Sequence, residues 1–299
     1  MVRVDKINER ITMFTLDQLR TSWLIRDRRT ILIESGFPSN ASEILAGLGK
    51  ISLTARDIDF LALTHVHLDH AGGAGLIAKQ NPDLKVFVHE KGARHLSDPA
   101  KLIQGARKAY DGNEFSSDNK MLPVPEQQIV PVDSGHVIDL GDTQLEVYYT
   151  PGHAKHHVVF FDKASASVFP GDALGSKFPG FPNFVLSPPS DYDKEISKQS
   201  IDLIKAMNPK QIYFTHCGPY TIDGHDDLYE KLKKKHELWV DCVWDIMDQN
   251  PQADSEKVFQ IFLQKNKELE PYRSQYFSFR LSVRGILIYL TKNCNIREF

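Results

Sequence analysis

Cysteine is scarce in this chain, with only Cys217, Cys242 and Cys294 among 299 residues. So few and so scattered cysteines cannot build a disulfide framework or a cysteine-type zinc site. Because disulfides are typical of oxidising compartments, a reducing, cytoplasmic setting is the simplest interpretation. The first residues, Met1 to Asp5, do not follow the pattern of a signal peptide, which agrees with a cytoplasmic location.

Long apolar runs and an excess of one charge are also missing. No apolar stretch approaches the roughly 20 residues that a membrane-spanning helix needs, so we expect no membrane partner. The formal net charge of −3 gives no general electrostatic reason to bind nucleic acid. The lysines between 231 and 235 are flanked by Glu230 and Glu237, which indicates a solvated helix face rather than a nucleic-acid patch.

Histidine, by contrast, occurs twelve times and is clustered. The motif THVHLDH at residues 64–70 follows a strand-like apolar run and contains four side chains that can bind metal. Imidazole and carboxylate ligands suit Zn²⁺, with iron or manganese as alternatives. Neighbouring side chains on a turn point in different directions and cannot close around one ion. We therefore expect two divalent metal ions, with His65 and His67 binding one and Asp69 and His70 the other.

Three later strand-like segments also end in a residue that can bind metal. They are His153, Asp172 and His216, after the predicted strands 144–149, 167–169 and 211–214. In α/β folds the chemistry lies at the carboxyl ends of the strands. We therefore expect these residues and the first motif to converge on one sheet edge, with enough ligands for two metals and open positions for water.

The remaining pattern predicts two strand-rich halves followed by helices. The predicted strands before residue 140 are 11–15, 22–26, 30–34, 58–63, 85–89 and 135–140, and a further strand is 158–162. Helices are expected near 40–48, 73–79, 91–96, 99–110 and 191–207, and then at 228–248, 254–267 and 276–292. We predict a catalytic domain at 1–221 and a helical cap or dimerisation element at 222–299, which leaves a homodimer open. The irregular segment 92–131 is either a lid or a surface insertion.

The ordered motifs resemble those of the metallo-β-lactamase-fold hydrolases, in the glyoxalase II and lactonase-like branch. The resemblance covers about residues 8–220. It rests on His-x-His-x-Asp-His at 65–70, Thr-Pro-Gly-His ending at 153, Gly-Asp-Ala around 172 and Thr-His at 215–216. It implies an α/β fold, an αββα sandwich with a C-terminal helical extension, and a dinuclear site at one edge of the two sheets.

The resemblance also implies a role for each motif residue. The expected ligands are His65, His67 and His153 for one metal, Asp69, His70 and His216 for the other, and Asp172 as the bridge. Asp69 or a metal-bound water would carry a proton to the leaving group. His157 resembles a histidine of the glyoxalase II-like branch, and is expected either to orient substrate or to have a purely structural role.

The implied function is a dinuclear metal-dependent hydrolase that uses a metal-bridging hydroxide to cleave a thioester, lactone or related carboxylic ester of a small molecule. Two alternatives stay open on the same fold: a mononuclear iron oxidoreductase resembling persulfide dioxygenases, and a phosphodiesterase. The intact ligand set argues against a binding protein that has lost catalysis.

The substrate is less well defined by sequence. Lactonases place a Tyr shortly after the bridging Asp, whereas residues 174–176 contain none, although Tyr220 is a potential replacement. The Cys-Gly-Arg-like stretch of glyoxalase II is also missing, so glutathione thioesters are not indicated. The adjacent Asp69 and His70 argue against a β-lactamase proper. Aromatic residues at 178–184, with Phe277 and Phe279, would form either an apolar acyl pocket or part of the core.

Overall fold

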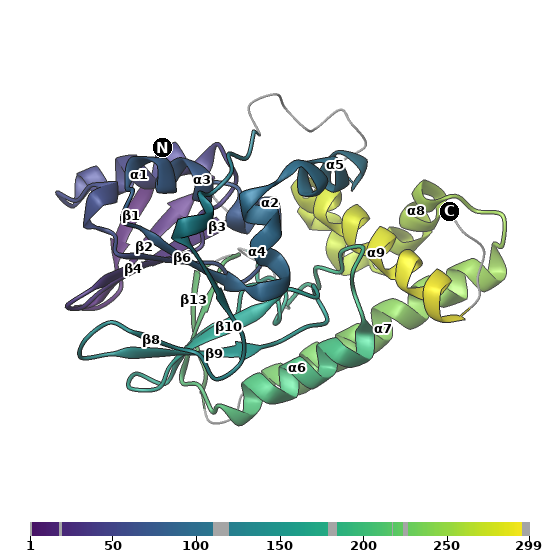
Figure 1. The fold of residues 1–299 in the computed structure, drawn as a ribbon. Coiled ribbons are helices and arrows are strands. Elements are labelled where there is room, and N and C mark those ends of the chain that lie inside the picture. Colours follow the sequence, from purple (N-terminus) through teal and green to yellow (C-terminus); the bar gives the residue numbers. More distant parts are fainter. Residues whose placement is uncertain are drawn as a thin grey trace.

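The computed structural model describes residues 2–17, 20–109, 120–178, 184–216, 218–223 and 227–294. Two β-sheets stack face to face, and helices cover their outer faces (Figure 1). This four-layer arrangement confirms the predicted αββα sandwich.

The first sheet has seven strands in the order of the chain. They are β1 (Arg3–Lys6), β2 (Ile11–Leu16), β3 (Arg20–Arg26), β4 (Thr30–Ile33), β5 (Phe60–Ala62), β6 (Lys85–His89) and β7 (Ile129–Val132). The first four strands form an antiparallel meander, and β4 to β7 run parallel. Parallel neighbours need crossover connections, which the helices between β4 and β7 supply.

The second sheet has six strands in the order β13-β12-β11-β10-β9-β8. Their bounds are β8 (Val137–Asp139), β9 (Gln144–Tyr149), β10 (Val158–Asp162), β11 (Ser167–Phe169), β12 (Gln211–Phe214) and β13 (Gly218–Thr221). Only β11 and β12 pair in parallel, and α6 (Lys194–Ala206) connects them. Between the sheets Trp23 is fully buried and packs against the rings of Phe169 and Tyr213.

Amphipathic helices cover both outer faces. On the first sheet α1 (Asn40–Lys50) and α3 (Ala74–Gln80) contribute Ile44, Leu48 and Ile77 to one buried cluster with strand residues. On the second sheet α6 and α7 (Leu228–Gln249) place Ile204 and Leu232 against β10 to β12. The shorter helices are α2 (Leu68–Ala71), α4 (Glu90–Ser97) and α5 (Ala100–Ala109), with single 3₁₀ turns at Ala55–Asp57 and Glu126–Gln128.

The C-terminal helices build a separate core. Helices α7, α8 (Ser255–Lys265) and α9 (Tyr276–Cys294), with a 3₁₀ segment at Lys267–Gln275, pack around Trp239 and Phe262. Leu186 and Tyr192, which precede α6, belong to the same cluster. In Figure 1 these helices lie beside the sandwich, and α7 extends from it alongside α6. The three predicted C-terminal helices are therefore confirmed, while the domain boundary at 221/222 stays a prediction.

Most differences from the predicted elements lie at their ends. Strands β1, β7 and β13 and the short helix α2 were not predicted. The strand expected at 58–63 is shortened to β5, because only Phe60–Ala62 pair with β4 and β6. The irregular segment expected at 92–131 contains α4 and α5, but residues 110–119 lie outside the described structure. Within the described ranges no helix is both long and apolar enough to cross a membrane.

Candidate metal centre

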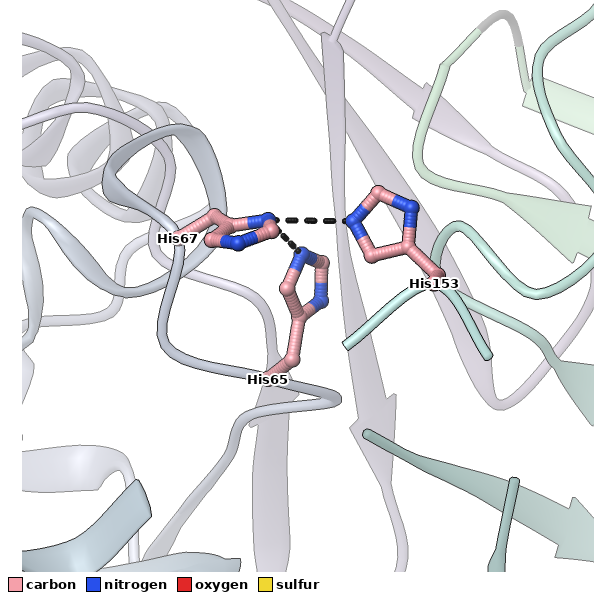
Figure 2. A group of neighbouring side chains, drawn as sticks. All are labelled: His65, His67 and His153. Carbon is pink, nitrogen blue, oxygen red and sulfur yellow. Dashed lines mark hydrogen bonds between the residues drawn. The ribbon is translucent and has the colours of Figure 1, made fainter. Parts of the chain in front are cut away.

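Three histidines form the first cluster (Figure 2). His65 and His67 come from the loop after β5, and His153 comes from the loop after β9. The Nδ1 atom of His67 lies 3.0 Å from His65 Nε2 and 3.0 Å from His153 Nε2. Two nitrogen ligands on a tetrahedral zinc ion are roughly 3.3 Å apart, given Zn–N bonds of about 2.0–2.1 Å. The three rings therefore present nitrogens at nearly the spacing that one metal requires.

The second cluster joins α2 to the end of β12. Oδ2 of Asp69 lies 3.7 Å from His70 Nε2 and 3.5 Å from His216 Nε2. Asp69 and His70 are consecutive residues of α2, and a β-bridge between Arg20 and His216 holds the third ligand beside the first sheet. These three side chains offer two imidazoles and one carboxylate to a second cation.

Asp172 lies between the two clusters. Its Oδ1 atom is 3.4 Å from His70 Nε2 and 3.3 Å from His216 Nε2. Its Oδ2 atom is 3.4 Å from His153 Nε2. One carboxylate thus directs one oxygen to each cluster, which is the arrangement that a bridging ligand needs.

Unpaired buried atoms support the presence of a cation. His70 Nε2 and Asp172 Oδ1 are both buried, and neither has a hydrogen-bond partner among the described residues. Leaving buried polar atoms unpaired costs about 1–3 kcal/mol each, so such atoms usually have a ligand. A divalent ion next to both atoms would satisfy them. The residues therefore fit the metals that the fold implies.

Hydrogen bonds behind the clusters fix the histidine tautomers. Thr64 donates its only hydroxyl proton to Oε1 of Glu34, so its oxygen must accept the proton of His65 Nδ1, 3.0 Å away. His70 Nδ1 likewise lies 3.1 Å from Glu34 Oε1 and donates to it. In both rings the Nε2 lone pair is left free for a metal.

Burial and neighbouring charge set the protonation of the metal-free centre. Burial lowers the pKa values of His65 and His153 well below their ordinary value, which keeps these rings neutral. Burial also lowers the pKa of His70, but the carboxylates of Asp172, Glu34 and Asp69 outweigh it and raise that pKa well above its ordinary value. Burial raises the pKa of Asp172, yet the nearby histidines, His70 first, hold it well below its usual range.

Sequence reasoning missed two residues beside the ligands. Glu34 follows β4, is 1% exposed, and adopts a left-handed backbone conformation with φ of 67°. The signal was a charged residue ending a buried strand before Ser35 and Gly36. Arg20 lies with its Nε 3.8 Å from Asp69 Oδ2, and its guanidinium helps the histidines to lower the pKa of Asp69 against the effect of burial. No sequence pattern pointed to Arg20.

The seven expected ligands lie together, but not at one sheet edge. The motif at 65–70 follows β5 of the first sheet, whereas His153, Asp172 and His216 follow β9, β11 and β12 of the second. The expectation of a single edge drawn from the strand ends is therefore corrected. The stacked sheets bring two edges together, in agreement with the arrangement that the resemblance implied.

His157 is placed behind the ligands rather than beside a substrate. Its Nε2 accepts the backbone N–H of Asp172 at 3.2 Å, its Nδ1 lies 3.0 Å from Thr150 Oγ1, and the side chain is fully buried. Both ring nitrogens have partners within the protein, which favours the structural one of the two roles expected for His157. The geometry favours a role in positioning Asp172.

The aromatic residues near 178–184 belong to packed cores. Phe178 and Phe279 are buried with ring centroids 6.0 Å apart, and Phe184 packs against Phe214 and Tyr220. They therefore do not form an open acyl pocket, and residues 179–183 lie outside the described structure.

A narrow cavity begins at the ligands instead. Its wall includes His153, Asp172, Leu186, Tyr192 and His236. The first two residues belong to the metal centre, whereas His236 lies on α7. The cavity therefore connects the centre with the C-terminal helices.

Comparison with known proteins agrees with this centre. The family model of the metallo-beta-lactamase superfamily matches residues 17–216. The metallo-beta-lactamase fold-containing protein ST1585 of Sulfurisphaera tokodaii is 27% identical over 225 residues, which cover 72% of this chain and 78% of that protein. A hydroxyacylglutathione hydrolase of Hahella chejuensis is 30% identical over 194 residues, 62% of this chain and 57% of that enzyme.

Structural similarity extends over nearly the whole chain. The metallo-beta-lactamase family protein TTHA1429 of Thermus thermophilus has a TM-score of 0.67 at 18% identity, and the match covers 98% of this chain and 93% of that one. At this identity the likeness concerns the fold alone. It includes the region of the C-terminal helices.

Proposed function

Because this chain belongs to the metallo-beta-lactamase superfamily, we propose that it is a dinuclear metal-dependent hydrolase of a small thioester, lactone or related carboxylic ester. The observation that carries this proposal is the position of Asp172, whose two oxygens face different ligand clusters. Zinc is the metal that the ligand set favours, since imidazole and carboxylate together suit this borderline ion.

The reaction adds water across the acyl–sulfur or acyl–oxygen bond, giving a carboxylic acid and a thiol or alcohol. When bound, two divalent ions supply a strong nucleophile near neutral pH and polarise the carbonyl oxygen. The protein's own residues hold and orient these ions. Asp69 is the proposed proton carrier, because its side chain is 20% exposed whereas those of His70 and Asp172 are almost fully buried. Its carboxylate can take a proton from water and pass it to the departing sulfur or oxygen.

Among these bonds, the relatives favour a thioester. The Hahella chejuensis relative is named a hydroxyacylglutathione hydrolase, and its named substrate class contains an acyl–sulfur bond. This chain spans little more than half of that enzyme, so only the bond type is carried over. The thiol part of the substrate stays outside the proposal.

Metal content and turnover test the proposal together. Protein prepared without added metal should contain about two metal equivalents and hydrolyse simple thioesters or lactones. His67→Ala should lower turnover at least about a hundredfold because it removes the nitrogen that lies between His65 and His153. His136→Ala, which changes a histidine of the β7–β8 turn, is the matched control and should retain both metal and activity.

Other outcomes separate the alternatives. One iron per chain with oxygen uptake and no hydrolysis would replace the proposal by a persulfide-dioxygenase-like reaction. Two metals with turnover of phosphodiesters alone would identify a phosphodiesterase. Asp172→Ala should lose metal as well as rate, and unchanged stoichiometry would remove its bridging role.

A further inference from the structure

A fourth histidine, His156, lies beside the first ligand cluster without belonging to it. Its ring centroid is 5.6 Å from that of His67 and 6.2 Å from that of His65, and it stacks on His65 with an interplanar angle of 13°. Among the described residues, only His65, His67 and His153 bring their ligand atoms together at this cluster. His156 therefore borders the site and is not placed as one of its ligands.

The backbone fixes which ring nitrogen of His156 carries the proton. Its Nδ1 atom accepts the N–H of Val66, 3.4 Å away, and Val66 lies between His65 and His67 in the sequence. A ring nitrogen that accepts a hydrogen bond carries no proton, so the imidazole proton is on Nε2. Helix α4 packs closely behind this ring, since a Cβ added to Gly92 would lie 3.4 Å from the Cβ of His156. His156 thus presents an N–H group that the fold holds in place.

This N–H group is open to solvent. The side chain of His156 is partly exposed, and its Nε2 atom has no hydrogen-bond partner among the described residues. Nε2 is also not one of the buried atoms that lack a partner, so it lies at the surface of the site. A donor that is fixed, accessible and unpaired within the protein is available to a ligand.

The accessible part of the metal centre lies next to His156. His67 and Asp69 are partly exposed, whereas the other five proposed ligands are at most 9% exposed: His65, His70, His153, Asp172 and His216. A substrate must therefore reach the centre past His67 and Asp69. Asp69 belongs to the second cluster and is the proposed proton carrier to the leaving group. The leaving group then lies at the second cluster, which puts the acyl carbonyl at the first cluster, beside His156.

We infer that His156 donates a hydrogen bond from Nε2–H to the carbonyl oxygen of the substrate and stabilises the negative charge that forms on this oxygen. This inference rests on the proposed hydrolase function and adds a substrate-contacting residue to it. Nucleophilic attack moves the π electron pair of the carbonyl to the oxygen, and the pair returns when the acyl–sulfur or acyl–oxygen bond breaks. The imidazole proton stays on Nε2 throughout, so His156 acts as a preorganised donor and leaves the balance of the reaction unchanged.

Two substitutions separate this role from a structural one. His156→Asn keeps an amide oxygen near the position of Nδ1, and with it the hydrogen bond to Val66, but has no donor near Nε2. His156→Gln is longer by one methylene, so it places its amide nitrogen near the position of Nε2 and gives up the bond to Val66. The two variants therefore each retain one half of the imidazole.

The measurement is hydrolysis of the acetyl thioester of N-acetylcysteamine. His156→Asn should lower kcat about 10–100-fold with little change in KM, because the hydrogen bond strengthens as charge develops in the transition state. His156→Gln should recover most of this loss, and both variants should keep the metal content of the wild type. If His156 only satisfied the backbone of Val66, Asn would be the more active variant and Gln the less active. That order would overturn the inference.

Binding of an anionic tetrahedral analogue gives a readout that does not depend on turnover. Methyl methylphosphonate should bind to metal-loaded His156→Asn about tenfold more weakly than to the wild type, as measured by calorimetry. His136→Asn, in the β7–β8 turn, is the matched control and should bind it normally.

The two readouts separate this inference from the hydrolase function. Unchanged kcat and unchanged analogue affinity in His156→Asn would overturn the inference while leaving the hydrolase intact. If no ester or thioester is hydrolysed but the analogue binds more weakly to His156→Asn, the proposed function fails and the hydrogen-bond donor stands.

Discussion

The Oε1 atom of Glu34 lies 3.1 Å from Nδ1 of His70, and both side chains are buried. The same oxygen accepts the hydroxyl proton of Thr64, which in turn fixes the ring of His65. One carboxylate therefore orients a histidine in each ligand cluster. This relationship explains why a glutamate is kept in a left-handed backbone conformation at the end of β4, since such strain persists where the surrounding contacts require it.

Replacing Glu34 by Gln should weaken metal binding at both clusters. The amide removes the negative charge behind His70 and provides a weaker acceptor for Thr64, so the free Nε2 atoms become poorer ligands. We expect the affinity for metal to fall about 10–100-fold, as for other partners of metal-binding histidines. Competition with a chelator measures this, and Glu90→Gln on the exposed start of α4 is the control. Equal affinity in the two variants would contradict the role of Glu34.

The contrast between Glu34 and the seven proposed ligands shows how much of the site can be predicted from the sequence. The grouping of the seven proposed ligands could be predicted because they follow strands in ordered motifs. Glu34 is a single acidic residue thirty positions before Thr64, and only the pairing of β4 with β5 brings it to the centre. His236 was equally hidden, because a lone histidine on an amphipathic helix gives no sign of which cavity it lines.

The helices and strands likewise divide into those that the sequence predicts and those that it does not. Strands and helices with strong periodicity were predicted to within a few residues, because burial of one face dictates their pattern. The edge strands β1, β7 and β13 were missed because each is short and half-exposed, and its position depends on a partner strand rather than on its own sequence.

Acid should release metal from the two clusters in sequence. In the metal-free protein the pKa of His70 is raised, so a metal must displace its proton, whereas His65 and His153 have lowered pKa values and are already neutral. Below the pKa of His70, affinity at the second cluster should fall about tenfold per pH unit. Lowering the pH from about 8 to about 5.5 should therefore remove one equivalent first. Cobalt absorption and metal analysis across this range check the order, and simultaneous loss of both equivalents would count against it.

Substitution of His157 should disturb Asp172 without removing a ligand. His157→Ala leaves the backbone N–H of Asp172 without its acceptor, so the shared carboxylate loses its fixed position. We expect the second metal equivalent to bind about tenfold more weakly. His157→Gln places an amide oxygen near the position of Nε2 and should recover part of the affinity. If Gln binds metal no better than Ala, the hydrogen bond to Asp172 is not what His157 contributes.

Gly171 should be intolerant of even a methyl group. Its φ is 49°, and an added Cβ would lie 2.4 Å from Thr64 Oγ1 and 2.8 Å from His157 Nε2. Gly171→Ala must therefore push the loop that carries Asp172 away from Thr64 and His157, in addition to the roughly 1–2 kcal/mol that a left-handed conformation costs an L-residue. Gly49→Ala on α1 makes the same change where an added Cβ meets nothing within 4 Å, and should stabilise the protein by about 0.5–1 kcal/mol.

Urea unfolding with a chelator present separates the backbone cost of Gly171→Ala from the loss of metal. If the loop at Gly171 only shapes the fold, the variant should lose stability but bind metal as the wild type does once folded. If it holds Asp172 between the clusters, metal affinity must fall as well, by more than any change seen in Gly49→Ala. A stable variant with unaltered metal binding would show that the tight contact of Gly171 with Thr64 and His157 is not needed to position the shared carboxylate.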